Sequence, residues 1–436
     1  MEEGYYNSNN RKIILNSNLE KLDLSIDQSN TITAIKCNGN LKTLSLVGQD
    51  LTPFEEIDIE FNENLKFLKL QRFSIKSLIL NEKLEELDCS FNDISYLKLN
   101  KDLKKVYCHY NQLKEIQLNE NLIELDCSHN QISSLKLNKN LKKLNCSINN
   151  LTKLELNENL EELCAFINNI KEINLNENLK KLDISVNKLK TIILTENLEE
   201  LDVAHNKLIA IELNENLKKL DIEGNRLEKI ILNEKLEELN IWRNNLNEIK
   251  LTENLIKLDI SSNKLKTIVL NEKLEELDVS NNKRIGIKFN KNLKKLDISG
   301  SRLAKIILPK KLEELSISCN KLTEIELNEN LKKLDVSTNK LKKIILNEKL
   351  EELDVSFNNK LTTIKLNKNL TNLIAHSSTL EKIILNKKLE DLTISIIDNK
   401  NIQFDNSVNN SEVNIDYIIL PNNHLVKLGD YPRFRR

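Results

Sequence analysis

The chain has 436 residues, with 65 Lys and Arg against 66 Asp and Glu, so its formal net charge is −1. A charge this balanced provides no electrostatic attraction for nucleic acid or for an anionic membrane, and we expect neither as a partner. Only 7 Gly and 4 Pro occur, which excludes a fold made mainly of loops, because these residues punctuate loops.

The two ends of the chain differ from its middle. Residues 1–18 supply half a coil that we expect to cap a repeat array, and they contain no apolar run typical of a signal peptide. Residues 400–436, where the repeat register is lost, are predicted to form a C-terminal cap with a basic tail. No stretch of about 18 apolar residues exists, and the odd number of cysteines, seven, favours reduced thiols. We therefore expect a cytoplasmic protein without a membrane span.

Residues 19–399 form the array, with about twenty coils. Looser units of 22 and 24 residues start at Leu19 and Leu41. A strict 19-residue period then runs over residues 65–349, and a 20-residue unit starts at Leu350. A repeat this regular indicates one solenoid rather than several globular domains.

Each unit carries the pattern L-x-x-L-x-L-x-x-N, which nearly recurs in its second half. We count positions from the first leucine, so Leu179 is position one and Asn187 position nine of the unit LKKLDISVNKLKTIILTEN. The alternation of apolar residues at positions four and six is typical of a short strand. Nineteen residues leave no room for two extended segments, two corners and a helix. We therefore predict strands on one face of the coil, extended or 3₁₀ chain on the other, and little α-helix.

A single coil cannot fold by itself. Its inward apolar side chains, roughly six, contribute on the order of 9–18 kcal/mol if fully buried. Ordering the backbone costs ~1–2 kcal/mol for each residue of the coil. Neighbouring coils must therefore stack about 4.8 Å apart, so that their strands pair in parallel and their cores merge.

Two polar features repeat from coil to coil. Asn recurs at position nine, where a corner buries backbone amides that need partners, and Ser301 interrupts this column. Positions two and three alternate in sign, as in Glu85–Glu86 followed by Lys104–Lys105, which indicates a duplication unit of 38 residues. Stacked strands would place these opposite charges side by side, which favours ion pairs and the correct register.

One coil departs from the apolar pattern. Arg284 occupies a position at which neighbouring units have Leu or Ile. An unpaired guanidinium in the core would cost several kcal/mol. We therefore predict that Ile285 turns inward, that Arg284 reaches solvent, and that Gly286 absorbs the backbone distortion.

No group of residues indicates catalysis, a cofactor or a metal. A straight column of thiols cannot converge on a tetrahedral ion, so we interpret the cysteines at position six as small buried apolar residues. Asp recurs at position five and could bind cations weakly, but we expect interleaved Lys residues to neutralise that column. The five histidines form no triad with a nucleophile and an oxyanion hole. We predict that the protein is not an enzyme. The position-six cysteines are Cys89, Cys108, Cys127 and Cys146, and the aspartates include Asp259, Asp278 and Asp297.

The residues that break the Asp-Ser monotony of the strand face are the candidate binding residues. Exposed aromatic and Arg side chains form most interface hot spots, whereas drift in a multicopy array explains single replacements equally well. We expect substitution of Tyr107 and Phe166 together by Ser to weaken partner binding without lowering the melting temperature. The candidates are Phe91, Tyr107, His109, Tyr110, His129, Ile148, Phe166, Ile167, Trp242 and Arg243.

The L-x-x-L-x-L-x-x-N-x-L pattern of residues 19–399, with fifteen in-register units between Leu65 and Leu350, resembles the leucine-rich repeat family. The resemblance implies a right-handed solenoid whose concave parallel sheet binds another macromolecule, here an unknown protein. With the richness in Asn, Lys and Ile, the repeats also look like those of large protist-infecting DNA viruses, which would place the protein in the host cytoplasm. A structural scaffold or particle component without a discrete ligand is the alternative function. We expect a monomer, with self-association through the ends as the alternative.

Overall fold

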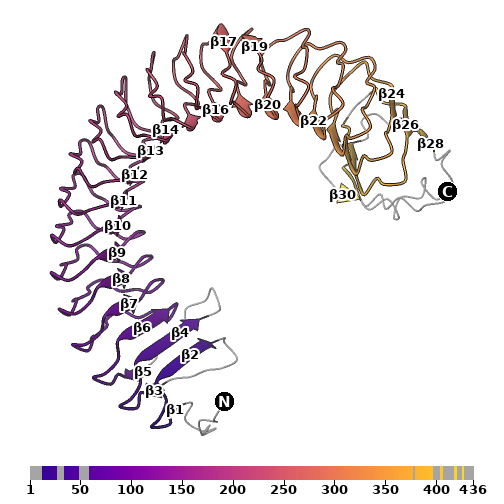
Figure 1. Ribbon diagram of the computed structural model, residues 1–436. Helices are drawn as coiled ribbons and strands as arrows, with labels where there is room; N and C mark the ends of the chain where they lie inside the picture. Colours follow the sequence, from indigo (N-terminus) through magenta and orange to yellow (C-terminus); the bar gives the residue numbers. More distant parts are fainter. Residues whose placement is uncertain are drawn as a thin grey trace. The chain divides into compact units, whose positions relative to one another are not determined.

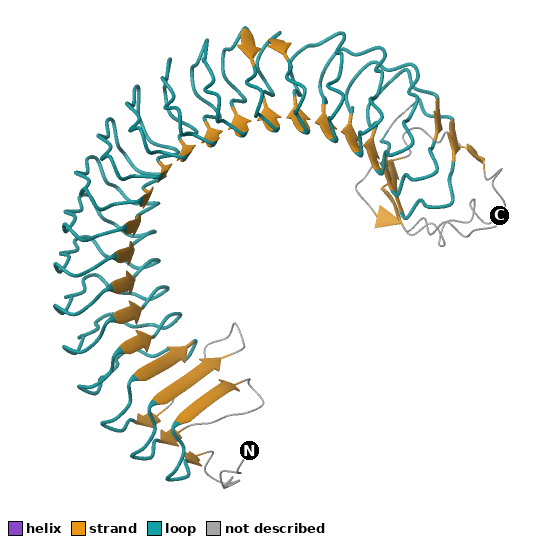
Figure 2. Cartoon of the chain, in the orientation of Figure 1, coloured by secondary structure: helices purple, strands orange, loops and turns teal. Residues whose placement is uncertain are grey.

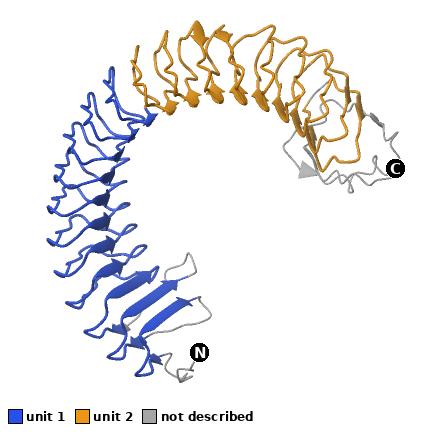
Figure 3. Cartoon of the chain, in the orientation of Figure 1, with its two compact units in different colours: residues 1–221 blue, residues 222–436 orange. Residues whose placement is uncertain are grey.

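The computed structural model describes residues 12–26, 34–48, 58–376, 379–395, 403–405, 417–419 and 425–426. The chain divides into two compact units, Met1–Asp221 and Ile222–Arg436 (Figure 3). The two predicted caps, residues 1–18 and 400–436, lie mostly outside the described residues, so their capping role stays a prediction.

In the first unit, successive coils each contribute one strand to a parallel ladder (Figure 1). A second, shorter ladder of three strands lies on the other side of the first coils. The main ladder contains β2 (Lys21–Ile26), β4 (Thr43–Gly48), β6 (Phe67–Gln71), β7 (Glu86–Asp88), β8 (Lys105–Tyr107), β9 (Glu124–Asp126), β10 (Lys143–Asn145), β11 (Glu162–Cys164), β12 (Lys181–Asp183), β13 (Glu200–Asp202) and β14 (Lys219–Asp221). The shorter ladder contains β1 (Lys12–Ile14), β3 (Ala34–Lys36) and β5 (Asp58–Glu60).

The second unit repeats this design. Its main ladder is parallel except for the last pair, β29 with β30, which is antiparallel. The ladder contains β15 (Glu238–Asn240), β16 (Lys257–Asp259), β18 (Glu276–Asp278), β20 (Lys295–Asp297), β21 (Glu314–Ser316), β22 (Lys333–Asp335), β23 (Glu352–Asp354), β25 (Asn372–Ile374), β27 (Asp391–Ser395), β29 (Tyr417–Ile419) and β30 (Leu425–Val426). Shorter parallel ladders on the opposite side join β17 (Thr267–Val269) with β19 (Gly286–Lys288), and β24 (Thr363–Lys365) with β26 (Lys382–Ile384) and β28 (Gln403–Asp405).

The predicted parallel-strand solenoid is confirmed. Within each unit the main ladder lines the inner side of the curve, and extended chain and turns form the outer side (Figure 2). The described residues contain no α-helix and no 3₁₀-helix, so the outer side is extended. Apolar residues of the repeat fill the interior, as Leu182 and Ile184 do in one coil, and in-register pairing sets Leu182 beside Leu201 of the next coil. The four position-six cysteines are fully buried, as expected of small apolar residues.

The asparagine column serves adjacent coils, as predicted. The side-chain Nδ2 of Asn168 donates to the carbonyl oxygens of Ala165 (3.1 Å) and Cys146 (3.1 Å). Its Oδ1 accepts from the backbone N–H of Leu151 in the preceding coil at 2.9 Å. Each carboxamide therefore closes its own corner and bonds to the preceding coil, which satisfies buried backbone groups that would otherwise lack partners.

A second asparagine column, not foreseen from the sequence, occupies position seventeen at the other corner of the coil. The Nδ2 of Asn157 donates to the carbonyl oxygens of Asn138 (2.6 Å) and Leu141 (3.0 Å). Its Oδ1 accepts from the backbone N–H of Asn159 at 3.0 Å. The recurring N-E-N sequence is therefore a corner motif that links neighbouring coils.

The alternating charges meet as expected from the stacking. Glu85 accepts hydrogen bonds from Lys66 and Lys104 of the coils on either side, both at 2.8 Å, and Lys143 pairs with Glu162 at 2.9 Å. The two lysines hold the pKa of Glu85 down at about 2. The three lysines are exposed and the two glutamates are partly exposed, so each pair adds only tenths of a kcal/mol. Like charges would meet if the register slipped.

The coil with Arg284 follows the prediction in part. Ile285 is 3% exposed and Arg284 reaches solvent. The distortion, however, lies at Arg284 itself, whose φ is +58°, while Gly286 has no positive φ and starts β19; the expected role of Gly286 was wrong. The reason is the missing carboxamide at Ser301, because the N–H of Arg284 bonds to the Ser301 backbone oxygen (3.0 Å) where other coils bond to an Asn side chain.

Candidate protein-binding surface

The backbone turns sharply at position eight, just before the asparagine of position nine. In every coil from the one starting at Leu65 to the one starting at Leu350, this residue has a φ between +49° and +66°. The N–H of position eight donates to the carbonyl of position seven in the next coil, as from Ile148 to Phe166 at 2.8 Å. The hydrogen-bond ladder therefore continues into the corner and holds position eight in the left-handed conformation.

This conformation suits glycine and penalises bulky residues. Gly224 and Gly300 adopt it freely at position eight of two coils. Ile148, Ile167 and Val186 are β-branched, and for such residues a positive φ costs on the order of 1–3 kcal/mol. The strain brings no gain inside the core, because Ile167 and Val186 are 43% and 42% exposed.

The bulky position-eight residues occur in eight successive coils of the first unit, and we call them the position-eight stripe. The guanidinium carbon of Arg72 lies 4.8 Å from the centroid of the Phe91 ring. Phe91 stacks on Tyr110 with centroids 4.5 Å apart, and Tyr110 stacks on His129 at 3.8 Å. The stripe consists of Arg72, Phe91, Tyr110, His129, Ile148, Ile167, Val186 and His205.

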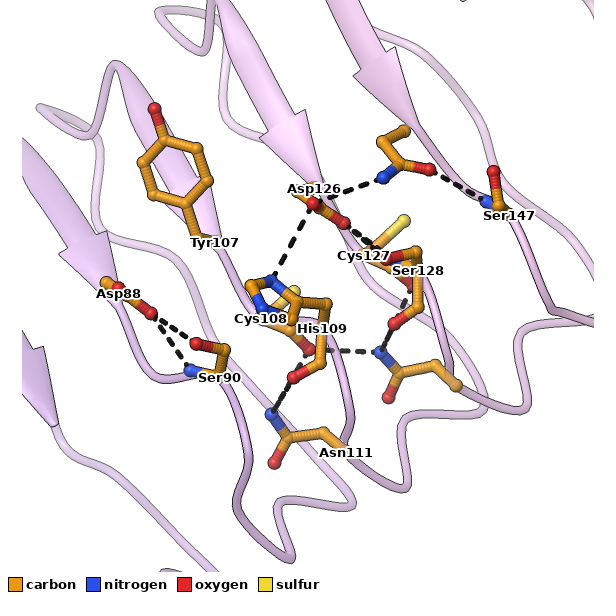
Figure 4. Close-up of polar contacts among 12 residues, drawn as sticks. Asp88, Ser90, Tyr107, Cys108, His109, Asn111, Asp126, Cys127, Ser128 and Ser147 are labelled. Carbon is orange, nitrogen blue, oxygen red and sulfur yellow. Dashed lines mark hydrogen bonds and ion pairs between the residues drawn. The ribbon is translucent and has the colours of Figure 1, made fainter. Parts of the chain in front are cut away.

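The candidate residues at positions five and seven, unlike those at position eight, lie partly buried on the strand face. Tyr107 is half-buried, and its hydroxyl donates to Oε1 of Glu124 at 2.9 Å; burial, followed by this bond, raises the Tyr107 pKa. The Nδ1 of His109 lies 3.7 Å from Oδ2 of Asp126 (Figure 4). Phe166 is half-buried as well. These three side chains contribute to packing on the strand face, so they are less free to meet a partner than the sequence suggested.

Trp242 and Arg243 belong to the second unit. Trp242, at position seven, is half-buried, while Arg243, at position eight, is exposed with a φ of +54°. Their position-eight neighbours within this unit are Gly224 and Ser262, which are small. Arg243 therefore extends no stripe, and the ten candidates fall into a contiguous group in the first unit and an isolated pair in the second.

The structure adds residues that the sequence reading passed over. Arg72, Val186 and His205, which are not among the ten candidates, complete the stripe. Phe357, 49% exposed, occupies the same position in the second unit. Their shared repeat position was visible in the sequence. Its meaning was not, because the left-handed backbone appears only in the structure.

The aspartate column behaves differently from the expectation. Asp259, Asp278 and Asp297 are in-register neighbours, and burial, with repulsion from the other two carboxylates, raises the pKa of Asp278 to about 6. The lysines of these coils pair with glutamates instead, as Lys295 does with Glu314. The predicted neutralisation by lysine was therefore wrong at Asp278, whereas Lys69 lies 3.7 Å from Asp88 in the same column of the first unit. Within the described ranges no group of three or more His, Cys, Asp or Glu side chains is arranged to hold a metal ion.

Comparison with solved structures places the fold among leucine-rich repeat proteins. YopM from Yersinia enterocolitica WA-314 superposes with a TM-score of 0.78 and 28% identity over 92% of this chain and 91% of its own. YopM from Yersinia pestis, described as a leucine-rich effector protein, matches with a TM-score of 0.60 and 28% identity over 70% of this chain and 86% of its own. No protein-family model and no curated protein matches the sequence. The part of the chain that the structure describes contains no helix able to cross a membrane.

Proposed function

We propose that this leucine-rich repeat solenoid is a non-enzymatic module that binds another protein through the position-eight stripe. The observation that carries the proposal is the series of bulky residues in a left-handed conformation over eight successive coils. Gly, Asn or Ser would suffice for a corner at this position, and four coils of the second unit have one of them there: Gly224, Ser262, Asn281 and Gly300. At Ile167 and Val186 this strain brings no gain in the core, which supports a role outside the folded chain.

The arrangement of the stripe supports binding in a second way. Arg72, Phe91, Tyr110 and His129 already stack on one another, so their side chains lose little conformational freedom when a partner covers them. Ile148, Ile167 and Val186 continue the same line with aliphatic surface. An aromatic and Arg cluster beside an aliphatic strip is the composition of an interface centre rather than of a rim.

The net charge and the fold indicate which kind of partner the protein binds. The near-zero net charge favours a protein partner over nucleic acid or an anionic membrane. The description of the Yersinia pestis YopM as an effector is consistent with this class of function. We also propose that the protein resides in the cytoplasm, within a host cell as the likeness to viral repeats implies.

The proposal is tested by comparing how much partner protein is captured by matched variants of this chain. Tyr110→Ser with Ile167→Ser removes two exposed members of the stripe, while Phe357→Ser removes an equally exposed residue of the same position outside it. Wild type and Phe357→Ser should capture the same protein from the native cell, and the double variant should capture it at least about tenfold less. The melting temperature of the double variant should change little, because the relief of strain at Ile167 offsets the loss of the stacking contacts of Tyr110.

Equal capture by all three proteins would overturn the stripe as the binding surface and favour a scaffold without a discrete ligand. Substitution of Tyr107 and Phe166 is the weaker test. Loss of the Tyr107–Glu124 hydrogen bond would itself lower stability, which would confuse binding with folding.

A further inference from the structure

A second surface feature lies on the outer side of the second unit, at position fifteen of the coils. Ile231, Val269, Ile307 and Ile345 are 85%, 64%, 89% and 68% exposed, and they recur every 38 residues. The intervening coils carry Lys250, Lys288 and Glu326 at the same position, all exposed. We call the five position-fifteen residues from Val269 to Ile345 the convex ridge.

The residues of the convex ridge are neighbours in space. The parallel pairing of β17 with β19, on the side opposite the main ladder (Figure 1), places Val269 directly beside Lys288. Coils stack about 4.8 Å apart or more, so the apolar members recur about every 10 Å. The aliphatic stem of a lysine covers apolar surface between such members. The ridge is therefore a continuous line of apolar and charged side chains.

The fold does not require this composition. Position fifteen is charged in alternate coils, so an extended chain there tolerates polar side chains without difficulty. The inward residue beside it, as at Ile268 and Ile344, already fills the core. The exposed Ile and Val residues bury nothing within the chain, whereas a regular apolar line on a surface is typical of an interaction site.

We propose that the convex ridge is a self-association surface, on which a second copy of this chain docks in antiparallel orientation about a two-fold axis at Ile307. In that arrangement Ile307 faces its own counterpart, Val269 faces Ile345, and Lys288 faces Glu326 twice by symmetry. A parallel arrangement would instead oppose Lys288 to Lys288 and Glu326 to Glu326, which costs free energy. Within the described residues neither Lys288 nor Glu326 pairs with another side chain, so both are free for the second copy.

The curvature of the unit also limits the affinity of the proposed self-association. The outer sides of two curved units touch over a few coils only, so the interface is small and apolar contact alone is limited. A dissociation constant of roughly 10–100 µM is expected. This association is independent of the position-eight stripe, which lies on other coils, and it differs from association through the ends of the array.

Sedimentation velocity of the full chain over a concentration series up to about 200 µM tests the proposal. Wild type should pass from monomer to dimer. Ile307→Asp, which brings two carboxylates together at the axis, should raise the dissociation constant at least about tenfold. Ile79→Asp, at the same repeat position but in the first unit and 87% exposed, is the matched control and should associate like wild type.

Charge exchange tests the orientation. Lys288→Glu and Glu326→Lys should each weaken association, and the double exchange should restore it, because each single change opposes like charges and the double change re-forms both pairs. These exposed substitutions also keep the proposal testable if Ile307→Asp fails to fold. A wild type that stays monomeric over the series, or single exchanges that associate like wild type, would overturn the proposed antiparallel dimer. A Tyr110→Ser, Ile167→Ser variant that still dimerises would show that the two surfaces are separate.

Discussion

Substitution of Asn149 by Ala should show how much the asparagine column contributes to stability. The side chain is buried, and its Nδ2 donates to the carbonyl oxygens of Cys127 at 3.0 Å and Cys146 at 3.1 Å. Its Oδ1 accepts from the backbone N–H of Ile132 in the preceding coil at 2.8 Å. Alanine removes all of these bonds without opening a large cavity.

The magnitude follows from what each partner retains. The Cys127 oxygen keeps a bond from Asn130 at 3.1 Å, and the Cys146 oxygen keeps one from Asn168 at 3.1 Å. The N–H of Ile132 loses its acceptor, and a buried unsatisfied donor costs about 1–3 kcal/mol. Two further bonds, each worth about 0.5–1.5 kcal/mol net, are lost. The expected loss in unfolding free energy is therefore roughly 4 kcal/mol.

Urea denaturation measures the loss, and hydrogen exchange locates it at the Ile132 amide, which should exchange faster in the variant. Asn150→Ala is the matched control. Asn150 is exposed, and its side chain makes no hydrogen bond to the described part of the chain. If the two variants lose the same stability within about 0.5 kcal/mol, or if the Ile132 amide keeps its protection, the reasoning about the column is wrong.

Two other predictions concern ionisable groups. Burial raises the pKa of Asp278 to about 6, above its value in an unfolded chain, so the cost of ionising it is absent below about pH 4 and complete above pH 6. Asp278→Asn should therefore raise the unfolding free energy by about 1–2 kcal/mol at pH 7.5, after allowance for its partial exposure, and leave it nearly unchanged at pH 3.5; equal effects at both pH values in urea denaturation would contradict this. Burial also raises the pKa of the Cys108 and Cys127 thiols, whereas Cys319 is exposed. Maleimide should label Cys319 in the native protein and the buried thiols only after denaturation, as peptide mass mapping would show, and comparable native labelling of all three would refute the buried column.

The sequence by itself determined the coil. Its 19-residue period, the apolar positions such as Leu182 and Ile184, the asparagine of position nine and the alternating charges predicted a helix-poor solenoid with in-register strands. This was possible because every coil meets the same surroundings, so one rule of burial and pairing repeats and becomes visible as a period. Ile285 could be placed inward for the same reason, because an unpaired guanidinium is costly in any core.

The tertiary structure decided what happens at individual positions. It showed that position eight is left-handed in every regular coil, which turned Ile167 from one candidate among ten into part of a strained stripe. It showed Tyr107 bonded to Glu124, and it showed that burial raises the pKa of Asp278, although the residue types suggested otherwise. Backbone dihedrals and cross-coil contacts depend on how a side chain reaches its neighbour one coil away. A repeat pattern shows which residues recur. Which neighbours each side chain contacts is determined only when the coils are stacked.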